Sequence, residues 1–280
     1  MNQQTYQVGG FRILPPVVKN LLIINILFYL ATLGFERFGI DLVDKLGLHF
    51  LTSEHFRFYQ LFTYMFLHGS FSHIFFNMFA LWMFGSAIEN IWGGKRFLIY
   101  YLVTGVGAAV LHYLVLFIEF QPTLTAIDAF LKNPDIPTFI HFMENGQLKI
   151  TSQEIATSYN AIIGEFNSLV NTNPTEALQI SIDFMNQYRI DFLNAPVIIG
   201  ASGAVFGLLL AFGMMFPNVY VYVFFAIPLK AKWFVIIYGV IELISGFSNV
   251  PGDSVAHFAH LGGMLFGYFL ILYWKKKGLF

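Results

Sequence analysis

The sequence has no cysteine and few charged residues. Without cysteine, disulfide bonds, thiolate nucleophiles and thiolate metal sites are excluded. Charged residues make up 11% of the 280 positions, against about 25% in ordinary soluble domains. The net charge of -1 provides no basic surface, so we expect no nucleic-acid partner. Hydrophobic residues instead reach 57% and aromatic residues 19%, which excludes a soluble or disordered chain and indicates a lipid bilayer as its surroundings.

The apolar residues form runs long enough to cross a membrane. A transmembrane helix needs about 20 predominantly apolar residues. Gly69 and Ser70 break one long run, so its helix is predicted to begin near Phe71. The residues before the first run lack the features of a cleaved signal peptide, so we expect that run to be retained as an anchor. The predicted spans cover residues 20–35, 71–88, 97–118, 196–216, 233–247 and 254–274.

The lysines and arginines between these spans predict the orientation. The segments on one side carry nine basic residues, and those on the other carry six across far longer loops. By the positive-inside rule, we expect both termini to lie in the cytoplasm.

One loop is out of proportion to the others. Residues 119–195 carry nine acidic and three basic residues and fall on the outer side of the predicted topology. Apolar residues from Ile155 to Leu169 recur at helical spacing, and Asn173 followed by Pro174 is typical of a helix start. We predict an acidic, helical, extracytoplasmic insertion. The expected organisation is residues 1–118 (tail and spans one to three), 119–195 (insertion) and 196–280 (spans four to six).

Polar side chains inside predicted spans are costly and often functional. Such residues form three groups: His68, His73 and Asn77; Ser202 within the run Gly-Ala-Ser-Gly; and His257 with His260. Each group has an ordinary interpretation as packing or interfacial residues, which we favour for His68 and His257. The predicted topology nevertheless places the remaining four residues, His73, Asn77, Ser202 and His260, at a similar depth below the outer surface. Unrelated packing residues would not be expected to share that depth.

This grouping predicts acyl-transfer chemistry. A serine hydroxyl needs a base to take its proton, and histidine is the only candidate base at the depth of Ser202. The backbone N–H of Ser202 and the side chains of His73 and Asn77 can stabilise an oxyanion. The fourth and sixth spans also carry matching Gly-x-x-x-Gly patterns, which allow close helix packing. The predicted packing residues are Gly203, Gly207, Gly263 and Gly267.

Taken together, these motifs resemble the rhomboid intramembrane serine proteases. The resemblance runs through residues 67–73, Asn77, Gly85, Glu89, 200–203, Gly207, 259–263 and Gly267. It implies an all-α polytopic membrane protein with a six-helix rhomboid-like bundle. It also implies that Ser202 is the nucleophile and His260 its base, as a dyad without an acid, and that His73 and Asn77 stabilise the oxyanion.

The chain departs from the family pattern in three places. Tyr59 and Gln60 stand where many members carry Trp-Arg, and Phe206 stands where a tyrosine often stacks on the catalytic histidine. The insertion is much longer than in the simplest bacterial members. We interpret His257 as lining the cavity and Glu242, in the fifth span, as a solvated or hydrogen-bonded carboxylate near a helix end.

The expected activity is an endopeptidase that cleaves single-pass transmembrane substrates near the outer membrane boundary. We expect no cofactor and no metal, and a location in a bacterial plasma membrane; the oligomeric state is not predicted. One alternative is an inactive rhomboid-like protein that binds transmembrane segments, although such a protein would normally have lost Ser202 or His260. A transporter is disfavoured because the sequence has no matching halves. A metalloprotease built on the four membrane histidines is disfavoured because no His-Glu-x-x-His motif occurs.

Overall fold

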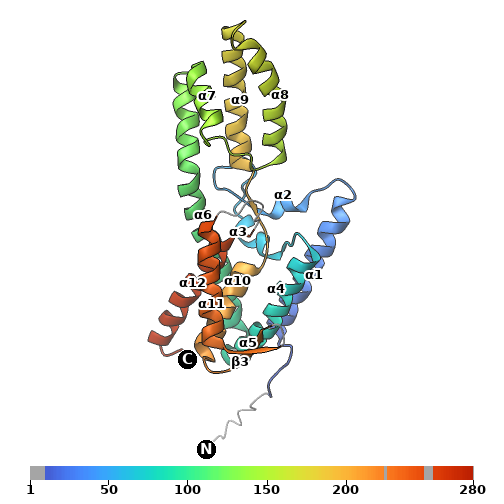
Figure 1. Cartoon of the computed structure of the whole chain (residues 1–280). Coiled ribbons are helices and arrows are strands. Elements are labelled where there is room, and N and C mark those ends of the chain that lie inside the picture. The colour runs from blue at the N-terminus through green and yellow to red at the C-terminus, as the bar shows by residue number, and fades with distance from the viewer. Residues whose placement is uncertain (1–9, 224–225, 249–254, 280) are drawn as a thin grey trace, which may run out of the picture. The chain divides into compact units, whose positions relative to one another are not determined.

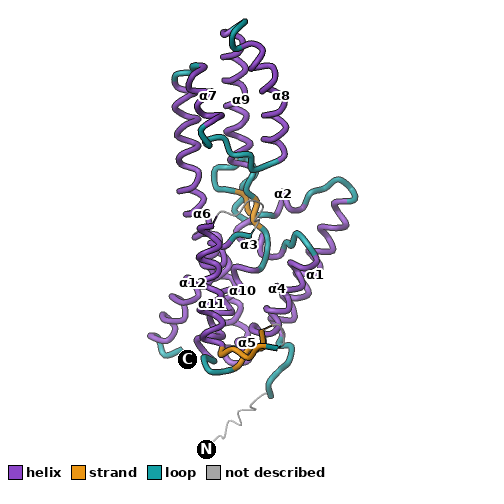
Figure 2. The backbone as a smooth tube through the Cα atoms, viewed as in Figure 1, coloured by secondary structure: helices purple, strands orange, loops and turns teal. Residues whose placement is uncertain are grey.

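The computed structural model describes residues 10–223, 226–248 and 255–279. Almost all of its regular structure is helical (Figures 1 and 2). The helices are α1 (Pro16–Glu36), α2 (Leu42–Leu46), α3 (Gln60–Thr63), α4 (Phe71–Ala80), α5 (Ser86–Trp92), α6 (Gly94–Lys132), α7 (Ile136–Glu144), α8 (Gln153–Leu169), α9 (Pro174–Asn194), α10 (Ser202–Met215), α11 (Ala231–Ser248) and α12 (His257–Lys276). A 3-10 turn, η1 (Tyr64–Phe66), precedes α4, and a π-helical segment, η2 (Leu81–Gly85), joins α4 to α5.

Strands occur as two short antiparallel pairs in the described part of the chain (Figure 2). Strand β1 (Leu48–His49) pairs with β2 (Val197–Ile198), so that Leu48 lies opposite Ile198 and His49 opposite Val197. Strand β3 (Tyr220–Val223) pairs with β4 (Ile227–Lys230) in the connection before α11. No pattern in the sequence predicts either pair.

The chain divides into two compact units. Unit 1 comprises Met1–Leu42, Leu61–His112 and Ile199–Phe280, and unit 2 comprises Val43–Gln60 and Tyr113–Ile198. Helix α6 contributes its first part to unit 1 and its last part to unit 2.

Four helical stretches among the described residues are long and apolar enough to cross a membrane. They are α1, the continuous run Phe71–Trp92, α6 and α11. In α1 and in α11, only 17% of the most apolar 18-residue stretch is buried within the protein. Most of the apolar side chains of these two helices therefore face outward, as contact with lipid requires. Helix α10 is apolar but shorter, with 14 residues. The predicted spans one, two, three and five therefore occur as helices of sufficient length, and the fourth occurs as the shorter α10. Helix α12 occupies residues 257–274 of the sixth predicted span, of which residue 254 lies outside the described residues.

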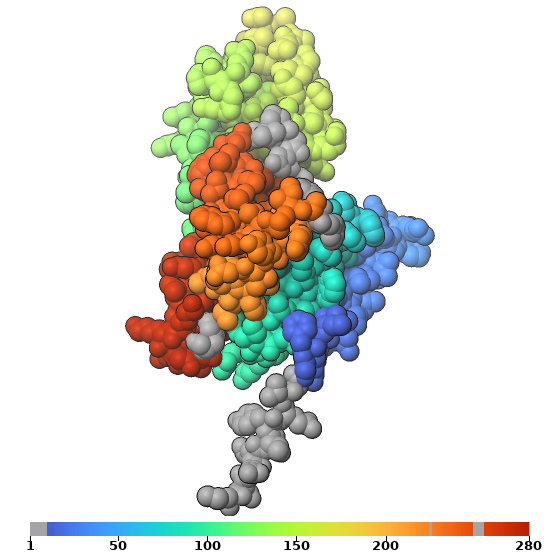
Figure 3. Space-filling view, turned by 60° about the horizontal axis from the view of Figure 1, so that its bottom comes forward, coloured from blue at the N-terminus to red at the C-terminus, as the bar shows by residue number. Residues whose placement is uncertain are grey.

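Helix α10 lies at the centre of unit 1. It packs against α12, α11, α4 and η2, and eight of its residues are buried. A helix that is apolar on every side is stable only in such a position or in lipid. Helices α1 and α4 lie side by side (Figures 1 and 3). The N-terminus of α1 is capped from α5, because the carboxylate of Glu89 accepts hydrogen bonds from Val17 N (2.9 Å) and Val18 N (2.8 Å).

Unit 2 has its own core of aromatic side chains. Phe139 of α7 contacts Phe166 of α8 and Phe184 of α9, while Phe142 contacts Tyr188. Side-chain caps start each of these helices: Asp135 for α7, Ser152 for α8 and Asn173 for α9. The hydrogen bonds that Asp135 accepts from Thr138 hold the pKa of its carboxyl below the usual range. The predictions of a helix along residues 155–169 and of a helix start at Asn173 and Pro174 are confirmed.

Two predicted helix ends differ from the structure. The fourth span was predicted from residue 196, but Val197 and Ile198 form strand β2, and α10 begins at Ser202. The β-branched residues favour the strand, and Gly200, with a φ of 123°, takes a conformation that ends it. The third span was predicted to end at residue 118, but α6 continues to Lys132 through Pro122. The predicted start of the second helix at Phe71 is confirmed, with Ser70 as its cap.

Candidate active site

Ser202 and His260 lie within hydrogen-bonding distance in unit 1. The distance between Ser202 Oγ and His260 Nε2 is 2.8 Å, although the two residues are 58 positions apart. Ser202 is the first residue of α10, and His260 lies in the first turn of α12. Ser202 is therefore at a helix N-terminus and not two turns into a helix, as the predicted span implied. Its backbone N–H is one of the first-turn amides that have no partner within the helix.

The other ring nitrogen of His260 contacts a carboxylate. Glu242 Oε2, from α11, lies 2.8 Å from His260 Nδ1. The same oxygen lies 2.7 Å from Nδ1 of His257. Glu242 and His260 are both buried. The structure thus differs from the expectation that His260 has no acidic partner: the serine, the imidazole and the carboxylate form a continuous chain of hydrogen bonds.

These contacts determine the tautomer of His260. A carboxylate accepts hydrogen bonds, so Nδ1 of His260 carries the proton and donates a hydrogen bond to Glu242. The lone pair of Nε2 then faces the Ser202 hydroxyl, which donates to it. The tautomer needed for a general base at Nε2 is therefore the one that Glu242 selects.

Phe206 fixes the plane of the His260 ring. The two rings stack with their centroids 4.2 Å apart and an interplanar angle of 5°. Phe206 is four residues after Ser202, so both side chains project from the same face of α10. The stacking that the resemblance implies is present with phenylalanine, which lacks the hydroxyl of a tyrosine.

The side chains of His73 and Ser202 both lie close to Gly200. A Cβ atom built on Gly200 would lie 2.7 Å from His73 Nε2 and 3.7 Å from Ser202 Oγ. Gly200 also adopts a φ of 123° and donates its N–H to Tyr64 O at 2.9 Å. Glycine is thus required here both by the backbone conformation and by the space that the imidazole occupies. The ring of the buried His68 packs edge-on against that of His73, with centroids 4.9 Å apart.

Asn77 lies one turn after His73 on α4. Its Nδ2 donates a hydrogen bond to His73 O at 2.9 Å, and the side chain is largely buried. An amide group carries two N–H donors, so this bond leaves a second one for another acceptor.

The four glycines predicted to pack helices make contacts of two kinds. A Cβ on Gly263 would overlap the backbone carbonyl of Gly203, so these two residues form the close approach between α10 and α12. A Cβ on Gly207 would overlap Thr104, and one on Gly267 would overlap the Tyr100 hydroxyl, both on α6. The Tyr100 hydroxyl donates a hydrogen bond to Gly207 O at 2.8 Å. The glycines therefore bring three helices together around Ser202 and His260.

The carboxylate and the two histidines also have the composition of a metal site. Glu242, His257 and His260 can each offer one ligand atom, with all three atoms within 4.8 Å of one another. Both Nδ1 atoms contact the same oxygen, and the remaining nitrogen of His260 faces Ser202. The hydrogen bonds account for each of these contacts, whereas a metal ion would have to displace two of them.

Sequence reasoning identified Ser202, His260 and Phe206 as neighbours but missed the role of Glu242. The signal was present, because Glu242 is the only charged residue between Lys232 and the end of α11. A lone carboxylate in a membrane helix needs a partner, and buried histidines on another span are the natural candidates. No spacing rule relates residues on different helices, so the pattern alone could not say which histidine it meets.

Comparison with known protein families identifies the family of the chain. The Rhomboid domain family matches residues 55–119 and 155–277, together about two thirds of the chain. Among proteins of curated function, none matches the sequence significantly. The match includes Ser202, Glu242 and His260, together with His73 and Asn77. The chain belongs to the Rhomboid family, a family of intramembrane serine proteases.

Proposed function

We propose that this protein is an intramembrane serine endopeptidase that cleaves single-pass transmembrane substrates near the outer membrane boundary. The observation that carries the proposal is the hydrogen-bonded series Ser202 Oγ, His260 Nε2, His260 Nδ1 and Glu242 Oε2, with both distances at 2.8 Å. Neither packing nor capping of the helices requires a serine, a histidine and a carboxylate in this order.

Ser202 is the nucleophile in this proposal. As its Oγ attacks the scissile carbonyl carbon, Nε2 of His260 takes the hydroxyl proton, and the carbonyl oxygen becomes an oxyanion. The imidazolium then gives that proton to the leaving amine, which departs and leaves an ester on Ser202. Water attacks the ester by the same steps, with His260 first as base and then as acid, and restores the free serine.

Glu242 is a positioning residue. It holds Nδ1–H of His260, so that Nε2 stays unprotonated before attack, and its negative charge stabilises the imidazolium that forms. The same carboxylate oxygen holds His257, which keeps the carboxylate itself in place. This arrangement is a Ser-His-Glu triad in place of the dyad that the family resemblance implies.

Three groups are positioned to stabilise the oxyanion. The N–H of Ser202 lies at the start of α10, where the helix dipole also favours negative charge. The imidazole of His73 and the hydroxyl of Ser202 both lie close to Gly200, and Asn77 follows His73 one turn along α4. We therefore assign His73 and Asn77 to the oxyanion, with Asn77 using the N–H that does not contact His73 O.

The proposed topology has six spans with both termini in the cytoplasm. Four of these spans are helical stretches that are long and apolar enough to cross a membrane by themselves, and α10 and α12 are the other two. Helix α6, at 39 residues, is about 58 Å long, nearly twice the hydrocarbon thickness of about 30 Å. Its C-terminal part therefore extends beyond the membrane, which supports an acidic helical insertion on the outer side.

Two measurements on the purified chain test the proposed activity. In detergent, a fluorophosphonate probe should label Ser202, and a reconstituted transmembrane substrate should be cleaved. Ser202→Ala should abolish both, and His260→Ala should match it in severity, because the nucleophile and its base act as a unit. Cleavage that persists in Ser202→Ala, or that chelators remove while labelling continues, would refute a serine mechanism.

The alternative is an inactive member that binds transmembrane segments without cutting them. It predicts binding of the substrate with no cleavage and no labelling in the unsubstituted protein. The intact Ser202–His260–Glu242 series favours the protease.

A further inference from the structure

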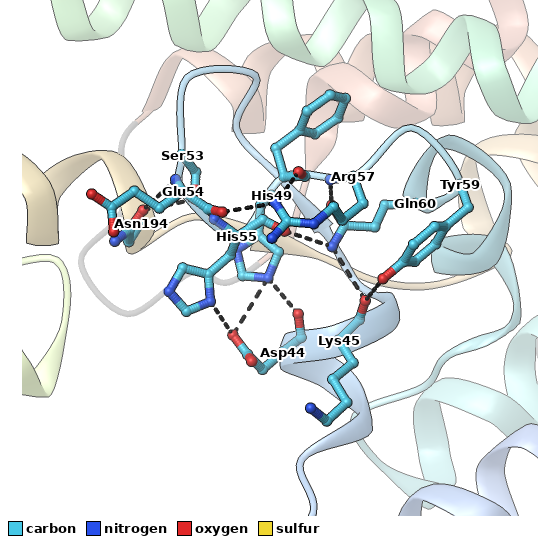
Figure 4. A network of polar contacts seen from close by, with 11 residues as sticks. Asp44, Lys45, His49, Ser53, Glu54, His55, Arg57, Tyr59, Gln60 and Asn194 are labelled. Atoms are coloured by element: carbon cyan, nitrogen blue, oxygen red, sulfur yellow. Dashed lines mark hydrogen bonds and ion pairs between the residues drawn. The ribbon is translucent and has the colours of Figure 1, made fainter.

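A second cluster of ionisable side chains lies in unit 2. It consists of Asp44 in the short helix α2, His49 in strand β1 and His55 in the following turn (Figure 4). His55 Nδ1 lies 2.8 Å from Asp44 Oδ1, and His49 Nε2 lies 3.6 Å from the same oxygen. One ligand atom from each residue lies within 4.8 Å of the other two. The three side chains converge on one point from three separate segments.

The surrounding backbone holds these residues in place. His49 is paired with Val197 in the sheet, and its carbonyl accepts a hydrogen bond from Tyr113 Oη. Asn194 Oδ1 accepts from Ser53 Oγ (2.7 Å) and from Glu54 N (3.2 Å). The amide of His55 in turn donates to Ser53 Oγ at 3.1 Å. The positions of both histidines are therefore set by contacts other than those they make with Asp44.

Gln60 closes the other end of the same loop (Figure 4). Its fully buried side chain donates to Lys45 O (3.3 Å) and His55 O (3.0 Å) and accepts from Arg57 N (3.0 Å). Tyr59 Oη also donates to Lys45 O, at 3.1 Å. The two residues that depart from the family pattern in this loop thus tie it to the end of α2.

The ligand atoms have the chemistry and spacing of a transition-metal site. Two imidazole nitrogens with one carboxylate oxygen suit Zn²⁺ and its neighbours, whereas Ca²⁺ and Mg²⁺ prefer oxygen ligands. Tetrahedral Zn²⁺ with bonds of roughly 2.0 to 2.1 Å separates its ligands by about 3.3 Å. The separations of His55 Nδ1 and His49 Nε2 from Asp44 Oδ1, 2.8 and 3.6 Å, lie on either side of that value, and all three ligand atoms lie within 4.8 Å of one another, so side-chain rotations can bring them onto one ion.

The buried histidine can supply the nitrogen that this site needs. His49 Nε2 now lies 2.7 Å from Asp44 O, and Nδ1 has no hydrogen-bond partner among the described residues. Metal binding at Nε2 replaces its contact with Asp44 O and moves the ring proton to Nδ1, so the metal–nitrogen bond must outweigh the lost hydrogen bond and the buried N–H. The side chains of Asp44 and His55 are 44% and 45% exposed, which leaves the fourth coordination position to water.

We propose that Asp44, His49 and His55 bind one divalent transition-metal ion of the Zn²⁺ class, which cross-links α2, β1 and the turn at His55. The ion stabilises the loop of residues 43–60 and takes no part in peptide hydrolysis. Three protein ligands with an exposed fourth position make the ion exchangeable with the medium.

The test is metal binding to the full chain in detergent after treatment with a chelator. Isothermal titration with Zn²⁺ should show a site that Ca²⁺ does not fill, and Co²⁺ should give the visible absorption of a tetrahedral complex. His55→Gln and Asp44→Asn, at half-exposed positions that tolerate substitution, should each weaken Zn²⁺ binding at least tenfold. His141→Gln, at an exposed histidine of α7, is the matched control and should bind as the unsubstituted chain does.

Thermal unfolding provides a second measurement. Excess Zn²⁺ should raise the Tm of the unsubstituted chain and of Ser202→Ala by several degrees, and should not raise that of His55→Gln. Zn²⁺ binding that is unchanged in both ligand variants would overturn the proposal. So would Zn²⁺ binding that survives in them but is lost in Glu242→Gln, because the ion would then lie at the other cluster.

Discussion

Replacing Glu242 by glutamine tests whether the enzyme uses a Ser-His-Glu triad or a Ser-His dyad. The substitution keeps the size of the side chain but removes its negative charge, and its amide group can present a donor to Nδ1 of His260. In the transition state the imidazole becomes a cation, and the centres of the two charges lie about 4 Å apart. At an effective dielectric constant of about 20, such a pair is worth about 4 kcal/mol. Losing it should lower kcat about 1000-fold.

The assay for Glu242→Gln is the steady-state cleavage of a reconstituted transmembrane substrate, with labelling by the fluorophosphonate as a second readout. We expect kcat and the labelling rate to fall together while KM changes little, because the carboxylate acts only through His260. Glu242→Asp should recover part of the loss. Glu36→Gln, the same chemical change at an exposed helix end, should have no effect. Activity of Glu242→Gln within about threefold of the unsubstituted chain would refute the reasoning, since a positioning carboxylate is worth far more than that.

Three further predictions concern the residues around the triad. Phe206→Ala should lower kcat roughly three- to tenfold, the value of one stacked pair, and Phe206→Tyr should restore it; equal activity in the alanine variant would mean that stacking does not orient the imidazole. Gly263→Ala should inactivate the enzyme and lower its Tm, because a Cβ there overlaps Gly203 O, whereas Gly164→Ala, with open space around it, should not lower the Tm. A stable and active Gly263→Ala would exclude the close approach of α10 and α12. Asn77→Ala should lower kcat roughly 10- to 1000-fold with little change in KM, and a defect in KM alone would contradict its assignment to the oxyanion.

The helices of this protein are largely readable from its sequence. Helix formation and helix capping depend on residues that are close together in the chain. The apolar runs, the Ser70 cap and the helix start at Asn173 and Pro174 can therefore be recognised from the sequence. The helix start predicted at residue 196 is wrong for a different reason. Strand β2 exists because its partner β1 lies about 150 residues earlier, and no local pattern at Val197 reports that pairing.

The same distinction applies to the active site. Ser202 and Phe206 share a helix face, so their relation follows from helical spacing, and motifs singled out His260. The contact of Glu242 with His260 depends on how α11 packs against α12, which no spacing within either helix determines. The cluster of Asp44, His49 and His55 was missed because its residues lie on a five-residue helix, a two-residue strand and a turn, which are all too short to show helical or strand periodicity.

The cap that Glu89 forms on α1 has a consequence for how the protein is assembled in the membrane. The amides of Val17 and Val18 leave the ribosome more than 70 residues before the carboxylate that binds them. Until α5 arrives, those amides depend on water, and after it arrives the buried carboxylate depends on them in turn. The first hairpin of the bundle is therefore locked only once its second helix is fully inserted, and a chain that stops before Glu89 lacks the group that would hold α1 in place.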